Sequence, residues 1–354
     1  MSKYWSNIVQ QLDPYVPGEQ PQDKQYIKLN TNENPYPPSP AVLDIIKHTS
    51  NDILKRYPDP EVSELRSALA KLHNVSANNV FVGNGSDEVL AHAFHAFFNN
   101  KALLYPDICY SFYPVYSQLY QSKTTTIPLD DNFCINPDDY CGHNKGIIFP
   151  NPNAPTSRYL ALDAIEKMVK NNAEVVIVDE AYIDFGGDSA IELTKKYDNL
   201  LVIQTFSKSR SMAGLRIGYA IGHTALIDGL NRIKNSFNSY PVDCIAQVAA
   251  VASINDQAYF EETTQKVIKT REFASTEFTK MGFEVIPSSA NFIMAKHPDL
   301  SAENLYNELK NKGILVRYFK KPRIDDYLRI TIGTNDEIAQ LIATVASLMS
   351  SLKT

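Results

Sequence analysis

The stretch LLVIQTF runs from Leu200 to Phe206 and is followed at once by Ser207-Lys208-Ser209. An apolar run this short, bounded by polar residues, predicts a β-strand that is buried on both faces. The stretches EVVIVD at 174–179 and GIIF at 146–149 have the same character, and residues 162–170 between them show helical spacing. Strands of this kind that alternate with helices predict a mostly parallel sheet with helices on both sides. The expected fold class is therefore α/β, an αβα sandwich.

The same alternation extends over most of the chain. Further helices are expected at 61–73 and 86–98, and further strands at 79–83, 101–105 and 217–221. From about residue 255 the pattern changes to a long helix ending near Lys280, then shorter strands near 283–286, 292–295, 315–317 and 328–332, and a terminal helix from Asp336. We therefore predict a large domain over residues 46–250 and a smaller α+β domain over 251–354. Residues 1–45 form an arm that belongs to the smaller domain, and prolines 35, 37, 38 and 40 argue against a helix there.

The composition argues against several classes of protein. The 354 residues carry 40 acidic and 34 basic side chains, a formal net charge of −6, and 44% hydrophobic residues. A mildly acidic globular chain has no general attraction for nucleic acid or for anionic lipid. No apolar run approaches the length of a membrane span, and the polar residues 1–20 are unlike a secretion signal. We expect a cytoplasmic protein that binds neither nucleic acid nor membranes.

No metal is expected either. The cysteines at 109, 134, 141 and 244 form no Cys-x-x-Cys pair, so neither a zinc site nor a disulfide framework is indicated. His92 and His95 lie three residues apart on a predicted helix and have no third ligand nearby, so buried histidines are the simpler interpretation.

Polar residues with complementary chemistry follow the strand at 200–206. Lys208 comes directly after the strand, and Arg216 follows eight residues later. Thr205 and Ser207 add two hydroxyl groups. Two cations and two hydroxyls suit a phosphate group. Taken alone, a lysine in this place is more often simply solvated, so the interpretation depends on the neighbouring strand ends.

Two neighbouring strand ends carry further polar groups. The strand at 174–179 ends in Asp179, with Tyr182 close behind, and a carboxylate there is costly unless it is paired with an arginine, a helix terminus or a protonated ring nitrogen. The strand at 79–83 leads into GNGSDE (83–88), a glycine turn before a helix, with Ser86 as the expected cap. Such a helix end holds phosphate through its free N–H groups. Glu88 stands where the dinucleotide fingerprint needs a third glycine, so a nicotinamide enzyme is disfavoured.

Together these groups meet the needs of pyridoxal phosphate. A lysine forms the Schiff base, and a buried aspartate keeps the pyridine nitrogen protonated so that the ring can act as an electron sink. The helix N-terminus, Arg216 and the hydroxyls would anchor the phosphate.

With these residues in view, the sequence resembles the fold type I aminotransferases that depend on pyridoxal phosphate, and within them the class II histidinol-phosphate aminotransferase branch. The resemblance runs along nearly the whole chain. Its segments are LNTNENPYPP (29–38), RYPDP (56–60), GNGSDE (83–88), PDICYSFYPVY (106–116), NPNAPT (151–156), VDEAYIDF (178–185), TFSKSRSMAGLRIGYAIG (205–222) and YLRITIGT (327–334). The lysine segment and DEAY are specific for the superfamily, whereas NENP, RYPDP and LRITIGT narrow it to the branch.

The resemblance implies the cofactor contacts by position. Lys208 resembles the Schiff-base lysine, Asp179 the partner of the pyridinium, and Tyr182 the donor to the ring hydroxyl. Tyr110 resembles the aromatic residue stacked on the ring, while the other tyrosines of the stretch 105–120 are expected mostly to pack. The residues similar to the family's phosphate-binding set are Ser86, Asp87, Thr205, Ser207 and Arg216, with Tyr57 reaching across a dimer interface.

The resemblance also implies substrate contacts and a homodimer. Arg329 resembles the arginine that binds the carboxylate of glutamate or the phosphate of histidinol phosphate, and Arg317 looks like a second anion contact. Tyr15 and Asn32 lie in the arm that helps close the site in this family.

One segment departs from the family pattern. The common sequence Asn-Asn-Pro-Thr-Gly is replaced by Asn153-Ala154-Pro155-Thr156-Ser157, so the asparagine that contacts the ring hydroxyl is missing at position 154. We expect Asn153 to face the cofactor ring in its place.

The function implied is amino transfer from glutamate, which leaves as 2-oxoglutarate, to imidazole acetol phosphate, giving histidinol phosphate in histidine synthesis. Two alternatives on the same scaffold stay open, an aromatic aminotransferase and a threonine-phosphate decarboxylase, because substrate choice lies in the arm and in residues 319–327. A third alternative is a non-catalytic ligand-sensing module.

Overall fold

A seven-stranded sheet with the order β2-β8-β7-β6-β5-β3-β4 forms the centre of the molecule. This computed structural model describes residues 3–21, 25–49 and 51–352. The strands are β2 (Val80–Gly83), β3 (Ala102–Pro106), β4 (Lys123–Ile127), β5 (Gly146–Pro150), β6 (Val176–Asp179), β7 (Leu200–Thr205) and β8 (Gly218–Gly222). Within this sheet, β8 alone runs opposite to the other strands. The predicted α/β fold with a mostly parallel sheet is confirmed.

The two faces of the central strands enter two separate cores. Val176 and Val178 of β6 point to one side and Ile177 to the other, and Val202 and Leu201 of β7 divide in the same way. This alternation explains why the strands are apolar throughout. The helices on the first face include α4 (Ser63–Leu72), α7 (Leu162–Lys170), α8 (Ile191–Thr194) and α10 (Cys244–Asn255), and those on the second include α5 (Gly85–Ala93), α6 (Phe112–Leu119) and α9 (Thr224–Phe237).

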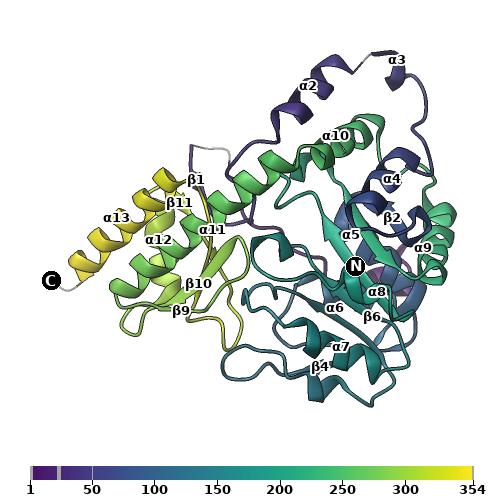
Figure 1. The fold of residues 1–354 in the computed structure, drawn as a ribbon. Helices are drawn as coiled ribbons and strands as arrows, with labels where there is room; N and C mark the ends of the chain where they lie inside the picture. The colour runs from purple at the N-terminus through teal and green to yellow at the C-terminus, as the bar shows by residue number, and fades with distance from the viewer. Residues whose placement is uncertain (1–2, 22–24, 50, 353–354) are drawn as a thin grey trace.

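The C-terminal part forms a separate core around a second, antiparallel sheet. Figure 1 shows the long helix α11 (Gln257–Lys280) leading into it from the layers of the large sheet. The sheet has the order β12-β13-β10-β9, with β9 (Glu284–Val285), β10 (Phe292–Lys296), β12 (Arg317–Tyr318) and β13 (Leu328–Thr331), and is accompanied by α12 (Ala302–Asn311) and α13 (Asn335–Leu352).

The N-terminal segment is tied to this C-terminal part. β1 (Ile27–Lys28) pairs in parallel with β11 (Ile314–Leu315), and Asn30 Nδ2 donates to Glu19 O at 2.9 Å. The Glu19 carboxylate in turn accepts a hydrogen bond from the hydroxyl of Tyr306 of α12 at 3.0 Å. The division into residues 1–45, 46–250 and 251–354 remains our proposal for the domain boundaries.

The expectation that the arm contains no helix needs correction. The prolines do not bar a helix at Pro40, which is the first residue of α2 (Pro40–His48). Proline is tolerated at that position because its missing N–H would have no partner inside the helix, and Ser39 Oγ caps the helix by accepting from Val42 N. The arm also holds the short helix α1 (Asn7–Gln11), and α3 (Asn51–Leu54) follows α2.

Several elements were not predicted from the sequence. They include β1, helices α6, α8, α9, α10 and α12, and strand β4, whose sequence KTTTI lacks a core-facing apolar pattern. Over the ranges that the structure describes, no helix is both long and apolar enough to cross a membrane.

Replacing Gly218 with alanine should destabilise the large sheet. A Cβ atom at Gly218 would lie 2.2 Å from Ser86 N, a backbone atom of α5 that cannot move freely. We expect the free energy of unfolding of Gly218→Ala, measured with urea, to be about 1–3 kcal/mol lower than that of the wild type. Gly214→Ala is the control, because a Cβ there meets nothing within 4 Å. Equal stabilities of the two variants would contradict the close approach of β8 to α5.

Candidate active site

A cavity of about 710 Å³ opens where the parallel strands end. Its walls come from the ends of β5, β6 and β7, the first turn of α5, the N-terminal arm, and strands β12 and β13. The predicted site residues that line it are Tyr15, Asn32, Ser86, Asp87, Tyr110, Asp179, Tyr182, Thr205, Ser207, Lys208, Arg216, Arg317 and Arg329. Tyr57 and Asn153 are not among the lining residues.

Asp179 is a buried carboxylate at the end of β6. Its Oδ2 accepts from the Tyr113 hydroxyl at 3.0 Å, and its Oδ1 accepts from Ala181 N at 3.3 Å. Burial raises the pKa of the Asp179 carboxyl from 3.8 to about 7, although both hydrogen bonds oppose the shift. A cationic N–H in the cavity would restore the charged carboxylate, so this site fits a protonated ring nitrogen.

The sequence does not identify Tyr113 as part of the site. Tyr113 packs in the core as expected for the tyrosines around Tyr110, but its hydroxyl also donates to Asp179, a role that was not predicted. Tyr116 likewise packs in this core, and its hydroxyl donates to Asp87 O at 2.9 Å. The partners Asp179 and Asp87 lie far from these tyrosines in the sequence, so no local sequence signal could reveal the two hydrogen bonds.

The first turn of α5 lies close to Arg216. The Arg216 Nη2–Asp87 Oδ2 distance is 3.0 Å, and the Tyr110 hydroxyl donates to Asp87 Oδ1 at 2.8 Å. Gly85 has φ +82°, and a Cβ there would stand 2.6 Å from Arg216 Nη2, so a side chain at position 85 would displace the guanidinium. Arg216, Asp87 and Tyr110 therefore meet beside the first turn of α5, at one corner of the cavity.

The capping role expected for Ser86 is wrong. α5 begins at Gly85, its N-cap residue is Asn84, and Ser86 lies inside the first turn. The Asn84 side chain instead donates from Nδ2 to Pro241 O at 2.7 Å. Ser86 is thus placed on the cavity wall, where its hydroxyl and the N–H groups of the first turn can serve an anion.

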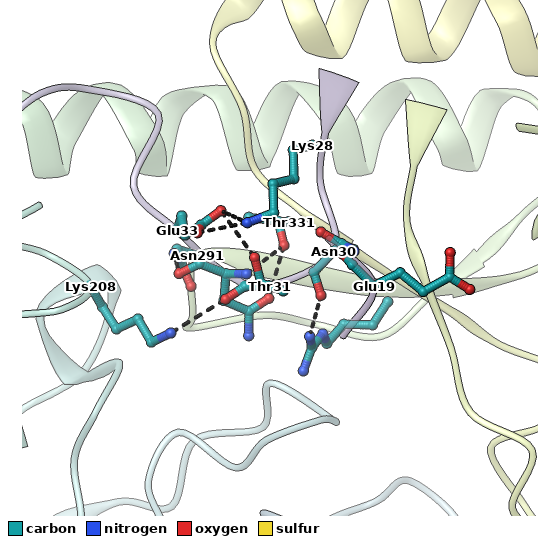
Figure 2. Close-up of polar contacts among 10 residues, drawn as sticks. Glu19, Lys28, Asn30, Thr31, Glu33, Lys208, Asn291 and Thr331 are labelled. Atoms are coloured by element: carbon teal, nitrogen blue, oxygen red, sulfur yellow. Dashed lines mark hydrogen bonds and ion pairs between the residues drawn. The ribbon is translucent and has the colours of Figure 1, made fainter. Parts of the chain in front are cut away.

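The Lys208 amine points toward the N-terminal arm (Figure 2). Lys208 Nζ lies 3.4 Å from Thr31 O and 5.7 Å from the centroid of the Tyr182 ring. The arm also holds the lysine loop, because Asn34 Nδ2 donates to Lys208 O at 3.0 Å. Asn32 Nδ2 donates to the Tyr182 hydroxyl at 3.0 Å. The arm therefore closes one side of the cavity over the lysine.

Two arginines stand opposite each other on the far wall. Arg317 and Arg329 are register partners in the antiparallel pair of β12 and β13, and the Phe319 ring lies 5.3 Å from both guanidinium carbons. Arg329 Nη2 donates to Asn30 O at 2.9 Å, whereas its buried Nε has no partner within the described part of the chain. Like charges in direct register are unfavourable, so this pair fits an anionic ligand between them.

The structure contradicts the expectation that Asn153 faces the cofactor. Its Nδ2 donates to Ile108 O at 3.0 Å and to Thr156 Oγ1 at 2.8 Å, and it is not on the cavity wall. Ala154 lines the cavity in its place. Asn153 therefore fixes the backbone between two loops and does not stand in for the family's asparagine at position 154.

Tyr57 lies outside the cavity. Its side chain is 82% exposed and stacks on Tyr240, with ring centroids 4.7 Å apart. Its predicted contact across a dimer interface needs a second chain and stays a prediction.

The arrangement fits pyridoxal phosphate. The cavity combines a lysine amine, a buried carboxylate without a cationic partner among its hydrogen bonds, and a helix N-terminus with an arginine at one corner. These are the groups that a protonated pyridine ring, an aldehyde and a phosphate require.

Asp179 should also make the ligand-free protein less stable as the pH rises. Its carboxyl loses a proton near 3.8 when unfolded and near 7 when folded, so the folded state binds more protons between these values and stability falls there with rising pH. We expect Asp179→Asn to flatten this fall by an amount on the order of a few kcal/mol, measured by urea unfolding between pH 4 and 8.

Glu180→Gln is the matched control. Burial also raises the pKa of Glu180 to about 7, but Glu180 does not line the cavity. It should flatten the slope similarly while keeping the binding of pyridoxal phosphate, which Asp179→Asn should weaken. Unchanged slope and unchanged cofactor binding in Asp179→Asn would contradict the account.

Comparisons with known proteins identify the family. Residues 24–345 match the model of the family "Aminotransferase class I and II". The chain is 57% identical to histidinol-phosphate aminotransferase 1 of Hydrogenovibrio crunogenus and 56% identical to histidinol-phosphate aminotransferase 2 of Dechloromonas aromatica. The first alignment covers 99% of both chains, and the second covers 96% of this chain and 98% of the relative.

A solved structure has the same fold. Histidinol-phosphate aminotransferase of Sinorhizobium meliloti, in complex with pyridoxal-5'-phosphate, superposes with a TM-score of 0.90 at 23% identity over 99% of both chains. The chain therefore belongs to the class I and II aminotransferases, enzymes that depend on pyridoxal phosphate, and within them to the histidinol-phosphate aminotransferase branch.

Proposed function

We propose that this enzyme exchanges an amino group between glutamate and imidazole acetol phosphate, giving 2-oxoglutarate and L-histidinol phosphate in histidine synthesis. The observation that carries the proposal is a single cavity that holds Lys208 and Asp179 together with the opposed guanidinium groups of Arg317 and Arg329. The high identity to histidinol-phosphate aminotransferases over nearly the full chain supports the same substrates.

The residues of the cavity divide the work. Pyridoxal phosphate, when bound, supplies an electron sink for the electrons released as the substrate Cα–H bond breaks. Lys208 Nζ would take up the proton from the substrate Cα and deliver it to the aldehyde carbon of the cofactor, and Asp179 would keep the ring nitrogen protonated. The first turn of α5 and Arg216 hold the cofactor phosphate. Arg329 and Arg317 bind the substrate anion, which is a carboxylate in glutamate and a phosphate in histidinol phosphate.

We also infer that the enzyme works as a cytoplasmic homodimer. The exposed rings of Tyr57 and Tyr240, which stack on each other, support such an interface, because large apolar groups gathered on a surface favour association. In such a dimer Tyr57 would reach the partner's cofactor phosphate.

The alternatives differ in substrate rather than in machinery. An aromatic aminotransferase and a threonine-phosphate decarboxylase would use Lys208 and Asp179 in the same way, so the substrate must be tested directly. A non-catalytic sensing module is set aside, since the chain belongs to an enzyme family.

The proposed substrate can be tested by visible absorbance. The purified protein, supplied with pyridoxal phosphate, should show a yellow absorbance band that bleaches when histidinol phosphate is added. 2-Oxoglutarate should then regenerate the aldehyde form of the cofactor and restore the band. Addition of glutamate should bleach the band again. Bleaching with glutamate or an aromatic amino acid but not with histidinol phosphate would overturn the substrate while keeping the amino transfer.

Lys208→Ala should lower turnover by several orders of magnitude, because it removes the amine at the end of β7 that carries the proton. Formation of 2-oxoglutarate from glutamate measures this. Lys208→Arg is the control for charge: its guanidinium stays protonated at all working pH values and should be equally inactive. Near-normal turnover in either variant would rule out the role of Lys208.

Arg329→Ala should raise the KM for glutamate and for histidinol phosphate by about 10–100-fold each, since both substrates lose hydrogen bonds to a charged partner. Initial rates with each substrate varied in turn provide the measurement. Arg232→Ala, which removes an exposed arginine of α9, should change neither KM. An effect on only one substrate would show that the two anions do not share Arg329.

A further inference from the structure

The segment from Phe319 to Tyr327 forms part of the substrate side of the cavity. It connects β12, which contains Arg317, to β13, which contains Arg329. Phe319, Lys321 and Ile324 of the segment line the cavity. Within the segment, the backbone hydrogen bonds are local: Lys321 N donates to Phe319 O, Ile324 N to Lys321 O and Tyr327 N to Ile324 O. Local turns of this kind do not by themselves fix where the segment lies over the cavity.

Arg323 attaches this segment to the large domain at three points. Its Nη1 lies 3.1 Å from Asp107 Oδ2, and its Nη2 donates to Leu129 O at 2.9 Å and to Asp130 O at 2.7 Å. The guanidinium carbon also stands 5.5 Å from the centroid of the Phe133 ring. A planar guanidinium can serve three acceptors and an aromatic face together, which a lysine ammonium cannot match in geometry.

Asp107, the ion-pair partner of Arg323, is itself part of the cavity wall. Its Oδ1 accepts from Ile108 N and from Leu129 N, both at 2.9 Å, and Asp107 itself lines the cavity. Ile108 and Leu129 pack with Ile324 in an apolar cluster beneath the ion pair. The contacts of Arg323 therefore join the segment 319–327 to the loop that leads to Tyr110.

The backbone of Arg323 adopts a conformation that is unusual for a residue with a side chain. Its φ is +72°, in the left-handed region that is unfavourable for residues with a Cβ atom. Arg323 is the third residue of a β-turn in which Ile324 N donates to Lys321 O, and Pro322 at the second position favours a turn that places the third residue in this region. The contacts of its side chain compensate for this unfavourable backbone.

We propose that Arg323 is a positioning residue for substrate binding. By holding the segment 319–327 against the large domain, it keeps the Phe319 ring against the guanidinium groups of Arg317 and Arg329, and so keeps both arginines aimed at the substrate anion. Without this attachment the segment would occupy other positions, and the binding-competent fraction of the enzyme would fall. The inference rests on the proposed function for the role of the two arginines.

The test compares Arg323→Ala with the wild-type holoenzyme. If the competent fraction falls to about a tenth, the KM for histidinol phosphate and for glutamate should each rise about tenfold, with kcat changed less than about threefold. The absorbance maximum of the bound cofactor and the affinity for pyridoxal phosphate should stay unchanged, because Arg323 does not line the cavity. Amide hydrogen exchange should become faster within 319–327 and stay unchanged in β6 and β7.

Three further variants sharpen the result. Arg323→Lys keeps the charge near Asp107 but not the fork, and it should give an intermediate KM. Asp107→Asn keeps the acceptor for Ile108 N and weakens the ion pair, so it should raise both KM values even if Arg323→Ala fails to fold. Lys320→Ala is the matched control. Lys320 belongs to the same segment but pairs with Glu303 on the surface, so this variant should change neither KM.

The outcomes separate this inference from the proposed function. Unchanged KM values in Arg323→Ala and in Asp107→Asn would overturn the positioning role, as would an equal loss of cofactor affinity and kcat, which would indicate a purely structural role. A wild-type enzyme that accepts glutamate but not histidinol phosphate would overturn the proposed substrate alone, and the KM for glutamate would still report on Arg323.

Discussion

The burial of one carboxylate at the end of a central strand is the constraint on which the rest of the site depends. Asp179 ends β6, in the middle of the large sheet, and its two hydrogen-bond donors, the Tyr113 hydroxyl and Ala181 N, are neutral. Their contribution does not offset the cost of taking the charge out of water, which is why burial raises the pKa of Asp179 to about 7. A ligand with a protonated ring nitrogen would form an ion pair with the Asp179 carboxylate. The other residues of the cavity would bind the aldehyde and the phosphate of that ligand.

The two sides of the cavity have different origins. The cofactor side comes from the large sheet, where Lys208 follows β7 and the first turn of α5 follows β2. The substrate side comes from the arm and the C-terminal sheet. The Thr331 hydroxyl of β13 accepts from Asn32 N at 2.9 Å, and Asn32 reaches the Tyr182 hydroxyl. This division lets a common cofactor site be combined with a substrate wall that differs between enzymes of one fold.

The sequence predicted the parts of the site that follow from strand ends and family motifs. The strands ending at Asp179 and before Lys208 are recognised from their apolar runs, and both residues line the cavity as expected. It did not predict Tyr113, Tyr116 or Arg323, because their partners lie far away in the chain and no periodic pattern marks a hydrogen bond of that kind. The prediction for Asn153 was wrong for a related reason: its side chain, one position away from the family's asparagine, donates to Ile108 O and Thr156 Oγ1 and is not on the cavity wall.

The most direct test of this account is the protonation state of the cofactor's ring nitrogen. The enzyme can be reconstituted with pyridoxal phosphate labelled with ¹⁵N in the ring, and the ¹⁵N chemical shift can be followed from pH 6 to 9. We predict a protonated ring nitrogen over this whole range in the wild-type enzyme and an unprotonated one in Asp179→Asn. The same shift in both proteins would contradict the claim that the buried carboxylate of Asp179 holds the proton.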